Sequence, residues 1–388
     1  MKFYVIQIFG KSNLVYGFGG GLKTIMDMSK IWKVLGNEVT FITVQSREFV
    51  KTNIPEINSV NIPSDSFSEA PGIALLKSIK HFYLVLHIFK REFSKSLDKE
   101  TLLISASHYP PDLLATFIIS MRYKVNAVAY FHHLSIAPWH YPFKRGILRT
   151  WINYLLQTSA LFLCKIAAIT ISLEHPEEAE RVGWRLDKII PLQGYVEYKR
   201  QAFCEERVYD GSYVGRISRS KGMVDLLKAW RYVTLQLPDA ILVIGGTFFP
   251  DSSKVKFEKL VAKLNLTKNL KILGYVSESD KIKILRQSKT FVSASYEEGW
   301  GLAVMEAASF GAVPVTYDLD AYDYLGPTRV VAKIGDPEEL AERIVEILKD
   351  EIKRKTIQRE LKIEVDKYDL WEIAKSQLHL FNKIINRR

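Results

Sequence analysis

The sequence predicts an α/β protein with two doubly wound, Rossmann-like parallel-sheet domains. Apolar strands alternate with helices along most of the chain, as is typical of parallel sheets that carry helices on both faces. A polar stretch at 196–210 lacks clear periodicity and divides this alternation into two runs. The length of 388 residues also suits two domains of ordinary size. We therefore expect domains at 1–195 and 211–369 that face each other across a cleft, joined by a linker at 196–210.

The first run begins with an apolar segment at 2–9, which predicts a strand, and the glycines at 19–21 open a helix. The next strands are expected at 38–44, 102–105, 125–131 and 167–173. The most apolar segment, 155–173, is interpreted as a helix followed by a buried strand. A membrane span is the less favoured alternative there, because Gln157 and Lys165 interrupt the apolar run.

The second run restarts with a strand at 212–214 and a helix from Gly222. Further strands are expected at 240–244, 270–273, 290–293 and 313–317, with helices from about 253, 277 and 301. Residues 336–339 read Asp-Pro-Glu-Glu, which predicts a helix start with an N-cap aspartate and acids at the positive end of the helix dipole. A last helix at about 370–388 is expected to pack back on the first domain.

The composition excludes several classes of protein. With 47% hydrophobic and 25% charged residues, the chain is neither disordered nor a coiled-coil rod. Cys164 and Cys204 form no CxxC motif, which argues against a disulfide scaffold and a structural zinc site. The first ten residues resemble a strand and not a signal peptide, so a cytoplasmic location is expected.

Positive charge is concentrated in one part of the chain. Residues 71–170 carry 12 Lys/Arg and 4 Asp/Glu, and so hold +8 of the formal net charge of +11. Such a face suits an anionic partner, either phospholipid or nucleic acid. In 73–97, apolar residues recur every three or four positions beside a basic face, so this helix either lies in a membrane interface or is a core helix with a solvated rim.

The first candidate site is the loop Gly17-Phe-Gly-Gly-Gly21, where Gly20 and Gly21 would let a phosphate approach the backbone at a helix N-terminus. A dinucleotide cofactor is disfavoured, because Leu22 breaks the GxGxxG pattern and Gln45 stands where an acid would end the second strand. The alternative is a flexible glycine turn.

Arg216 and Lys221 form the second candidate. Arg216 follows a strand and Lys221 precedes a helix, so two cations lie beside free helix N–H groups. This arrangement suits a diphosphate, and the alternative is a pair of solvated surface charges.

The third candidate is the segment 295–315, which contains Glu298, the glycines Gly299 and Gly301, and Glu306. Glu306 falls in an apolar stretch of the predicted helix, and an unpaired buried carboxylate is costly. Ribose hydroxyls would satisfy it, and an internal salt bridge is the alternative.

His132 and His133 follow the strand predicted at 125–131. A histidine at the carboxyl end of a strand could hydrogen-bond a sugar hydroxyl or the reacting centre. A zinc site is disfavoured, since the side chains of adjacent residues diverge and no ligand follows at suitable spacing. A structural histidine is the alternative.

Taken together, these motifs resemble those of retaining, nucleotide-sugar-dependent glycosyltransferases of the GT-B fold, family 4 type. The resemblance covers almost the whole chain. It rests on Glu298 and Glu306 in an EX7E spacing, Gly215-Arg216 with Lys221-Gly222, Gly19-Gly20-Gly21, Tyr130-Phe131-His132, the segment 191–196, and Trp371.

The resemblance implies a role for each of these residues. Arg216 and Lys221 would hold the donor diphosphate, and Glu306 would bind the ribose. Glu298 would grip the transferred sugar, and His132 would lie near it on the acceptor side. The remaining donor-binding positions are Gly20, Gly21, Tyr275 with its neighbours in the base contact, Gly299, Trp300, Gly301 and Leu302. The implied catalytic set is His132, Glu298, Arg216 and Lys221, acting with retention, without a metal and without a cofactor.

The sequence thus predicts a retaining hexosyltransferase that acts on a lipid-linked or membrane-associated glycan at the inner face of the cell membrane. Docking is expected through 73–97 and 139–149. The alternatives are a soluble transferase or phosphorylase with the same donor site, or a basic nucleic-acid-binding protein. Departures from the family pattern at 311–316 and at Ala321 leave the donor sugar open.

Overall fold

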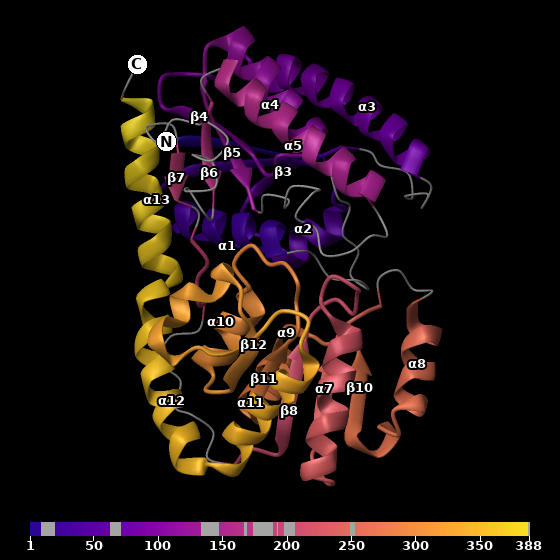
Figure 1. Ribbon diagram of the computed structural model, residues 1–388. Helices are drawn as coiled ribbons and strands as arrows, with labels where there is room; N and C mark the ends of the chain where they lie inside the picture. Colours follow the sequence, from indigo (N-terminus) through magenta and orange to yellow (C-terminus); the bar gives the residue numbers. More distant parts are fainter. Residues whose placement is uncertain are drawn as a thin grey trace. The chain divides into compact units, whose positions relative to one another are not determined.

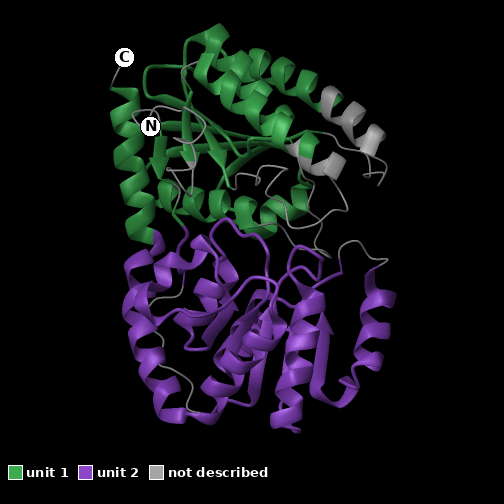
Figure 2. Cartoon of the chain, in the orientation of Figure 1, with its two compact units in different colours: residues 1–193, 371–388 green, residues 194–370 purple. Residues whose placement is uncertain are grey.

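A computed structural model describes residues 1–8, 20–62, 71–132, 147–166, 169–173, 189–191, 193–197, 206–248 and 253–386, without side chains at 71–79, 147–150 and 153. The chain forms two compact units. The first comprises 1–193 and 371–388, and the second comprises 194–370 (Figure 2). Gly17 to Gly19, His133, Cys204, 139–146 and most of the expected linker lie outside the described residues.

The first unit contains a parallel sheet in the order β3-β2-β1-β4-β5-β6-β7. Its strands pair in register, for example Phe3 with Val39 on one side and with Leu102 on the other. The described strands are β1 (Lys2–Gln7), β2 (Glu38–Thr43), β3 (Asn58–Asn61), β4 (Thr101–Ser105), β5 (Asn126–Phe131), β6 (Thr170–Leu173) and β7 (Ile189–Pro191).

Helices cover both faces of this sheet, with α1 and α2 on one face and α3, α4 and α5 on the other (Figure 1). The helix α4 begins at a pair of prolines, and the buried Asp112 in its first turn accepts a hydrogen bond of 2.6 Å from the Ile8 N–H after β1. The described helices are α1 (Gly20–Val34), α2 (Arg47–Asn53), α3 (Pro71–Ile88) with the π-helical turn η1 (Phe89–Phe93), α4 (Pro110–Tyr123) and α5 (Ile147–Ile166).

The second unit contains a parallel sheet in the order β10-β9-β8-β11-β12-β13. Its strands are β8 (Tyr209–Val214), β9 (Leu242–Gly245), β10 (Leu270–Gly274), β11 (Ser288–Ser293), β12 (Val313–Tyr317) and β13 (Val330–Ala332). Its helices are α7 (Met223–Gln236), α8 (Ser253–Lys263), α9 (Glu278–Arg286), α10 (Leu302–Ser309), α11 (Pro337–Lys349) and α12 (Glu351–Val365), with short 3-10 segments η4 (Thr267–Asn269), η5 (Asp320–Thr328) and η6 (Asp366–Tyr368).

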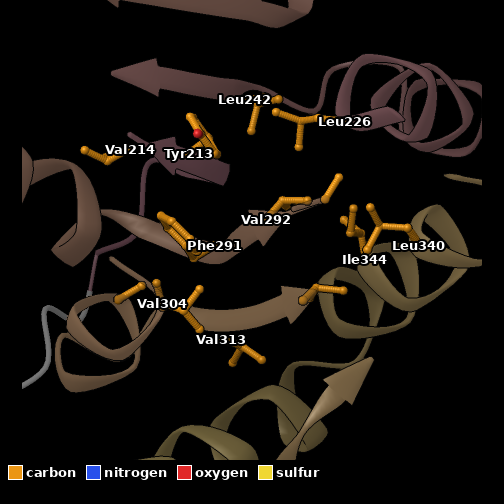
Figure 3. Close-up of a cluster of buried hydrophobic side chains, with 14 of the residues drawn as sticks. Tyr213, Val214, Leu226, Leu242, Phe291, Val292, Val304, Val313, Leu340 and Ile344 are labelled. Atoms are coloured by element: carbon orange, nitrogen blue, oxygen red, sulfur yellow. The ribbon is translucent and has the colours of Figure 1, made fainter. Parts of the chain in front are cut away.

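The core of the second unit lies between this sheet and its helices. Figure 3 shows Phe291 and Val292 of β11 among Leu226 of α7 and Leu340 and Ile344 of α11. All five side chains are buried, and each contributes about 1.5–3 kcal/mol relative to an exposed position. This packing anchors the strands whose carboxyl ends carry the predicted site residues.

The predicted α/β class with two parallel sheets is confirmed. The helix start at Asp336 is also confirmed, since its side chain accepts hydrogen bonds from the N–H groups of Glu338 and Glu339. The short edge strands β3, β7 and β13 were not expected, because three or four residues are too few to show an alternating pattern. Among the described helices, none is long and apolar enough to cross a membrane.

For the amphipathic segment 73–97, the structure favours the core-helix interpretation. In its described part Val85 and Phe89 are fully buried, and Phe93 packs against the same core cluster. The cations Lys80, Lys90, Arg91 and Lys95 are exposed on the rim. The apolar face of this helix is therefore used within the first unit.

The last helix, α13 (Leu370–Ile385), packs on the first unit. The ring of the buried Phe381 lies 5.7 Å from that of Phe3 and 5.4 Å from that of Trp32, both in edge-on geometry. One turn earlier on the helix, Gln377 accepts a hydrogen bond of 3.1 Å from the hydroxyl of Tyr130 on β5. The C-terminal helix is thus a structural part of the N-terminal unit.

We expect Phe381→Ala to destabilise the protein, because it leaves a cavity between α13, β1 and α1. The expected loss is about 3–5 kcal/mol in the free energy of unfolding of the first unit. Urea unfolding of the full chain followed by tryptophan fluorescence would measure it. Asn382→Ala, at an exposed position of the same helix, is the matched control and should change stability little. Equal stability of the two variants would contradict the packing described.

Candidate functional site

The strand order of the second sheet reverses between β8 and β11, so the connections after these two strands diverge. Ligands of doubly wound sheets bind at such a switch point, beyond the carboxyl ends of the strands. The connection after β8 is 215–222 and contains Arg216 and Lys221. The connection after β11 is 294–301 and contains Glu298. The topology therefore brings three predicted site residues to one edge.

Lys221 and Glu298 form an ion pair at this edge. The Lys221 Nζ lies 2.6 Å from Oε2 of Glu298, and both side chains are half-buried. The hydroxyl of Ser295 donates a hydrogen bond of 2.8 Å to Oε1 of the same carboxylate. Both groups keep some access to solvent, so a charged ligand can compete for either of them.

The two connections meet backbone to backbone, which explains a glycine at 222. Gly222 has a φ of +66°, and a Cβ there would lie 1.8 Å from the carbonyl oxygen of Ala294. The Tyr296 N–H donates a hydrogen bond of 3.0 Å to the Ser220 carbonyl. Any larger residue at 222 would push Lys221 away from Glu298.

The side chain of Arg216 is exposed, and a buried tyrosine holds its backbone carbonyl. The hydroxyl of the buried Tyr213 donates a hydrogen bond of 2.8 Å to the Arg216 carbonyl. Burial, helped by the negative charge of Glu298, raises the pKa of Tyr213 well above its usual range. The hydroxyl therefore remains a donor at physiological pH.

Gly301 is the N-cap of α10, with a φ of +68° that favours glycine. A Cβ at this position would lie 2.5 Å from the Tyr322 ring. The Tyr324 hydroxyl donates a hydrogen bond of 3.3 Å to the Gly301 carbonyl. The positive end of the α10 dipole thus follows Glu298 by three residues, with Gly299 and Leu302 half-buried on either side of the cap.

Trp300 is fixed by aromatic packing. Its indole stacks on Tyr324 at 5.4 Å and 9°, and meets Tyr368 edge-on at 5.6 Å. A Cβ at Gly194 would lie 1.7 Å from its Cδ1 atom, so the backbone of Gly194 lies directly against the ring. In the described part of the chain, the buried indole N–H has no hydrogen-bond partner.

Glu306 is buried on α10 and pairs with a residue that sequence reasoning missed. The Lys281 Nζ, on α9, lies 2.8 Å from each of the two Glu306 carboxylate oxygens. Lys281 also lies 2.8 Å from Glu278, one turn earlier on its own helix. The internal salt bridge that we considered for Glu306 is therefore present, and only the proximity of α9 to α10 reveals its partner.

Tyr275 follows β10, at the edge of the same sheet and two strands away from β8. Its side chain is exposed. Gly274 before it has a φ of +69°, which turns the chain at the strand end. Tyr275 thus follows a strand at the same carboxyl-terminal edge of the sheet as the other predicted residues, two strands away from the connection that carries Arg216 and Lys221.

In the first unit, the structure brings His132 and Gly21 together. A Cβ at Gly21 would lie 2.5 Å from the imidazole ring, so α1 passes the ring only because residue 21 is glycine. The His132 Nε2 lies 2.8 Å from the Ala106 carbonyl oxygen, which only accepts hydrogen bonds. Nε2 therefore carries the proton, and Nδ1 is a buried acceptor with no partner among the described residues. Burial lowers the pKa of His132 to about 4, so the ring is neutral at physiological pH.

Within the described residues, no group of three or more His, Cys, Asp or Glu side chains could hold a metal ion. Cys164 is buried as a free thiol in the core of the first unit. The described part of the second unit presents paired charges and helix N–H groups near the carboxyl ends of its parallel strands.

Residues 200–362 match the family described as glycosyl transferases group 1. The chain is 31% identical over 150 residues to poly(glycerol-phosphate) alpha-glucosyltransferase of Bacillus subtilis (strain 168), which is 37% of this chain and 21% of that protein. It is 23% identical over 191 residues to GDP-mannose:cellobiosyl-diphosphopolyprenol alpha-mannosyltransferase of Xanthomonas campestris, which is 47% of this chain and 48% of that protein. The chain thus matches less than half of the length of each of these curated relatives.

The solved structure of sucrose-phosphate synthase from Thermosynechococcus elongatus matches over 100% of both chains, with a TM-score of 0.81 and 16% identity. This likeness concerns the fold. Each unit has the Rossmann-like architecture of the GT-B glycosyltransferases, and the part of the chain at 200–362 is similar to the glycosyl transferases group 1 family.

Proposed function

We propose that this protein is a retaining glycosyltransferase that transfers a hexose-type sugar from a nucleotide-diphospho-sugar to a lipid-linked or membrane-associated glycan. The observation that supports the proposal best is the Lys221–Glu298 pair, 2.6 Å apart at the switch point and close in sequence to the N-terminus of α10. A diphosphate needs cations and free N–H groups, and a sugar needs a carboxylate and small residues around it. Both sets meet at this edge.

Arg216 and Lys221 are the proposed diphosphate ligands. Arg216 is exposed, and the ion pair of Lys221 with Glu298 is half-buried, so an incoming anion can reach both cations. Once Lys221 binds phosphate oxygen, Glu298 becomes available to the sugar hydroxyls. In this proposal the ion pair keeps Lys221 and Glu298 in position before the donor binds, and binding of the donor separates them.

The proposed reaction breaks the bond between the anomeric carbon and the diphosphate oxygen, and the electron pair leaves on the diphosphate. The acceptor hydroxyl attacks from the same face and passes its proton to the departing oxygen. Arg216, Lys221 and the α10 N–H groups stabilise the charge that develops on the leaving group. These groups supply positive charge where the step needs it, so the proposal requires no metal or cofactor.

His132 is proposed to act as a hydrogen-bond acceptor beside the sugar. Its Nδ1 has an available lone pair, and its Nε2–H is engaged with Ala106. Because the ring is neutral, it can accept a hydrogen bond from a sugar or acceptor hydroxyl without competing for the diphosphate.

Membrane contact is proposed through α5 instead of 73–97. Its exposed side chains include Leu155 at 59% and Phe162 at 62%. Among the residues of this helix whose side chains are described, the large apolar side chains that are exposed are Trp151, Ile152, Leu155, Leu156, Phe162 and Ile166. The helix lies in the α3–α4–α5 layer (Figure 1), within the part of the chain that carries most of the net positive charge. An apolar stripe beside exposed cations suits an anionic lipid surface such as the inner leaflet, and the Xanthomonas relative is named for a diphosphopolyprenol substrate.

The donor is tested by a thermal-shift screen of the full-length protein with UDP-, GDP- and ADP-sugars. A donor that binds only the folded state raises its melting temperature. The anomeric configuration of the product, read by NMR after transfer from the donor identified, tests retention. No shift with any nucleotide-sugar would overturn the proposal, and an inverted product would overturn its retaining part.

Replacing the proposed diphosphate ligands should slow transfer. We expect Arg216→Ala and Lys221→Ala each to lower kcat by roughly 30- to 1,000-fold, because each removes about 2–4 kcal/mol of leaving-group stabilisation. Steady-state assays with the donor identified above measure this. Lys289→Ala is the control. The Lys289 Nζ lies 2.8 Å from Oδ1 of Asp210, and this ion pair lies near the start of β11 and β8, at the opposite ends of these strands from the proposed site. An equal loss in the control would point to a general effect of breaking ion pairs.

The pKa of His132 makes stability depend on pH in a defined direction. The unfolded imidazole takes up a proton near pH 6.5, whereas the folded ring does so only near pH 4. The free energy of unfolding should therefore fall by up to about 2 kcal/mol more in the wild type than in His132→Asn as pH drops from 7.5 to 5. Urea unfolding at several pH values compares the two proteins. Parallel pH profiles would mean that the ring titrates normally in the folded state.

Polar substitution on α5 should weaken membrane binding. Flotation with anionic vesicles is expected to recover the wild type in a salt-sensitive manner, and neutral vesicles should recover little. Leu155→Ser/Phe162→Ser should lower the partition coefficient at least about tenfold, because two apolar side chains no longer enter the interface. Ile352→Ser/Ile363→Ser, which alters exposed apolar residues of α12 at 82% and 65%, is the control. Equal recovery with neutral vesicles would contradict the role of anionic lipid, and no recovery with either kind of vesicle would favour a soluble enzyme.

A further inference from the structure

The carboxylate of Glu306 is only partly used by the protein. Its two oxygens offer about four acceptor positions in all. Lys281 occupies one on each oxygen, at 2.8 Å, and no other donor reaches these oxygens within the described residues. One acceptor position therefore remains on each oxygen, which matches two neighbouring hydroxyl groups of a ligand.

Lys281 is itself held firmly in place. Its side chain is only 11% exposed, and it lies between Glu306 on α10 and Glu278 on its own helix, at 2.8 Å from each. The next lysine on α9, Lys283, is 73% exposed and lies 3.8 Å from Asp280. Lys281 thus links α9 to α10, whereas Lys283 on the same helix faces solvent.

We infer that Lys281 is a positioning residue for ribose recognition, which holds both Glu306 oxygens so that their remaining acceptor positions receive the 2′- and 3′-hydroxyls of the nucleotide. The inference rests on the proposed function, in which Glu306 binds the ribose. It adds a residue from a different helix and assigns to the Lys281–Glu306 pair the preference for ribonucleotides over nucleotides that lack these hydroxyls.

The physical reason is the cost of a buried charge. Glu306 is itself buried, in a stretch of α10 whose neighbouring residues Val304, Met305, Ala307 and Ala308 are all buried. A carboxylate in such surroundings is expensive to keep in place without a cation. Without Lys281, the side chain is expected to leave its position, and the two acceptors would no longer face the ribose together.

The experiment is a binding cycle between protein variant and ligand. Calorimetry measures the Kd of the nucleoside diphosphate that the wild type binds and of its 2′,3′-dideoxy counterpart. The proteins are the wild type, Lys281→Met, Lys281→Arg and the control Lys283→Met. We expect Lys281→Met to weaken binding of the ribonucleotide about tenfold, the size of a lost hydrogen bond to a charged group, and to leave the dideoxynucleotide unchanged within about twofold. Lys281→Arg should retain most of the ribose preference, and Lys283→Met all of it.

A second cycle guards against a general loss of structure. Glu306→Gln should itself reduce the ribose preference, and adding Lys281→Met to that variant should reduce it no further, because the lysine acts through the carboxylate. Equal weakening of both ligands by Lys281→Met, or no weakening of either, would overturn the inference. If the wild type binds no nucleoside diphosphate at all, it is the proposed function that fails.

Discussion

A carboxylate removed from water needs a cation or hydrogen-bond donors beside it, and each of the two acids of the proposed site in the second unit has a lysine as its partner. Lys221 pairs with Glu298, and Lys281 pairs with Glu306, at distances of 2.6 and 2.8 Å. Each pair joins two segments that are far apart in sequence, so the positions of both acids depend on the whole sheet. The acids carry the proposed ligand contacts, and the lysines determine where those contacts lie before any ligand arrives.

Tyrosine hydroxyls hold the backbone of the two connections that carry Lys221 and Glu298. Tyr213 and Tyr324 donate hydrogen bonds to the carbonyls of Arg216 and Gly301, and so hold the start of one connection and the end of the other. Tyr296 and Tyr317 both donate to the buried carboxylate of Asp225 on α7. Burial raises the pKa of these phenols, so they remain donors across the physiological range. Rigid aromatic side chains thus fix irregular backbone that has no strand partner of its own.

The sequence alone was sufficient to predict the fold class and to identify glycines whose conformation depends on their local setting. Glycines such as Gly222 and Gly301 are recognisable because a strand precedes them and a helix follows. Lys281 was not recognisable, because its partner is 25 residues away and becomes a neighbour only when α9 packs near α10. The periodicity of 73–97 predicted an apolar face but could not say what covers it. The core of the first unit covers that face, and the exposed apolar side chains occur on α5 instead.

The two proposed anionic partners place different demands on the protein, and the charge distribution reflects this. A diphosphate is small, and its recognition depends on direction, so it needs a few cations held by specific partners, as Lys221 is by Glu298. A lipid surface is broad and has no fixed geometry, so it responds to net charge and to exposed apolar area. Residues 71–170 carry +8 of the net charge of +11. In the proposed donor site, by contrast, Lys221 and Lys281 are each paired with a glutamate. Because paired charges add little to the long-range field, attraction to a membrane would come mainly from the first unit, while donor selection depends on short-range contacts in the second.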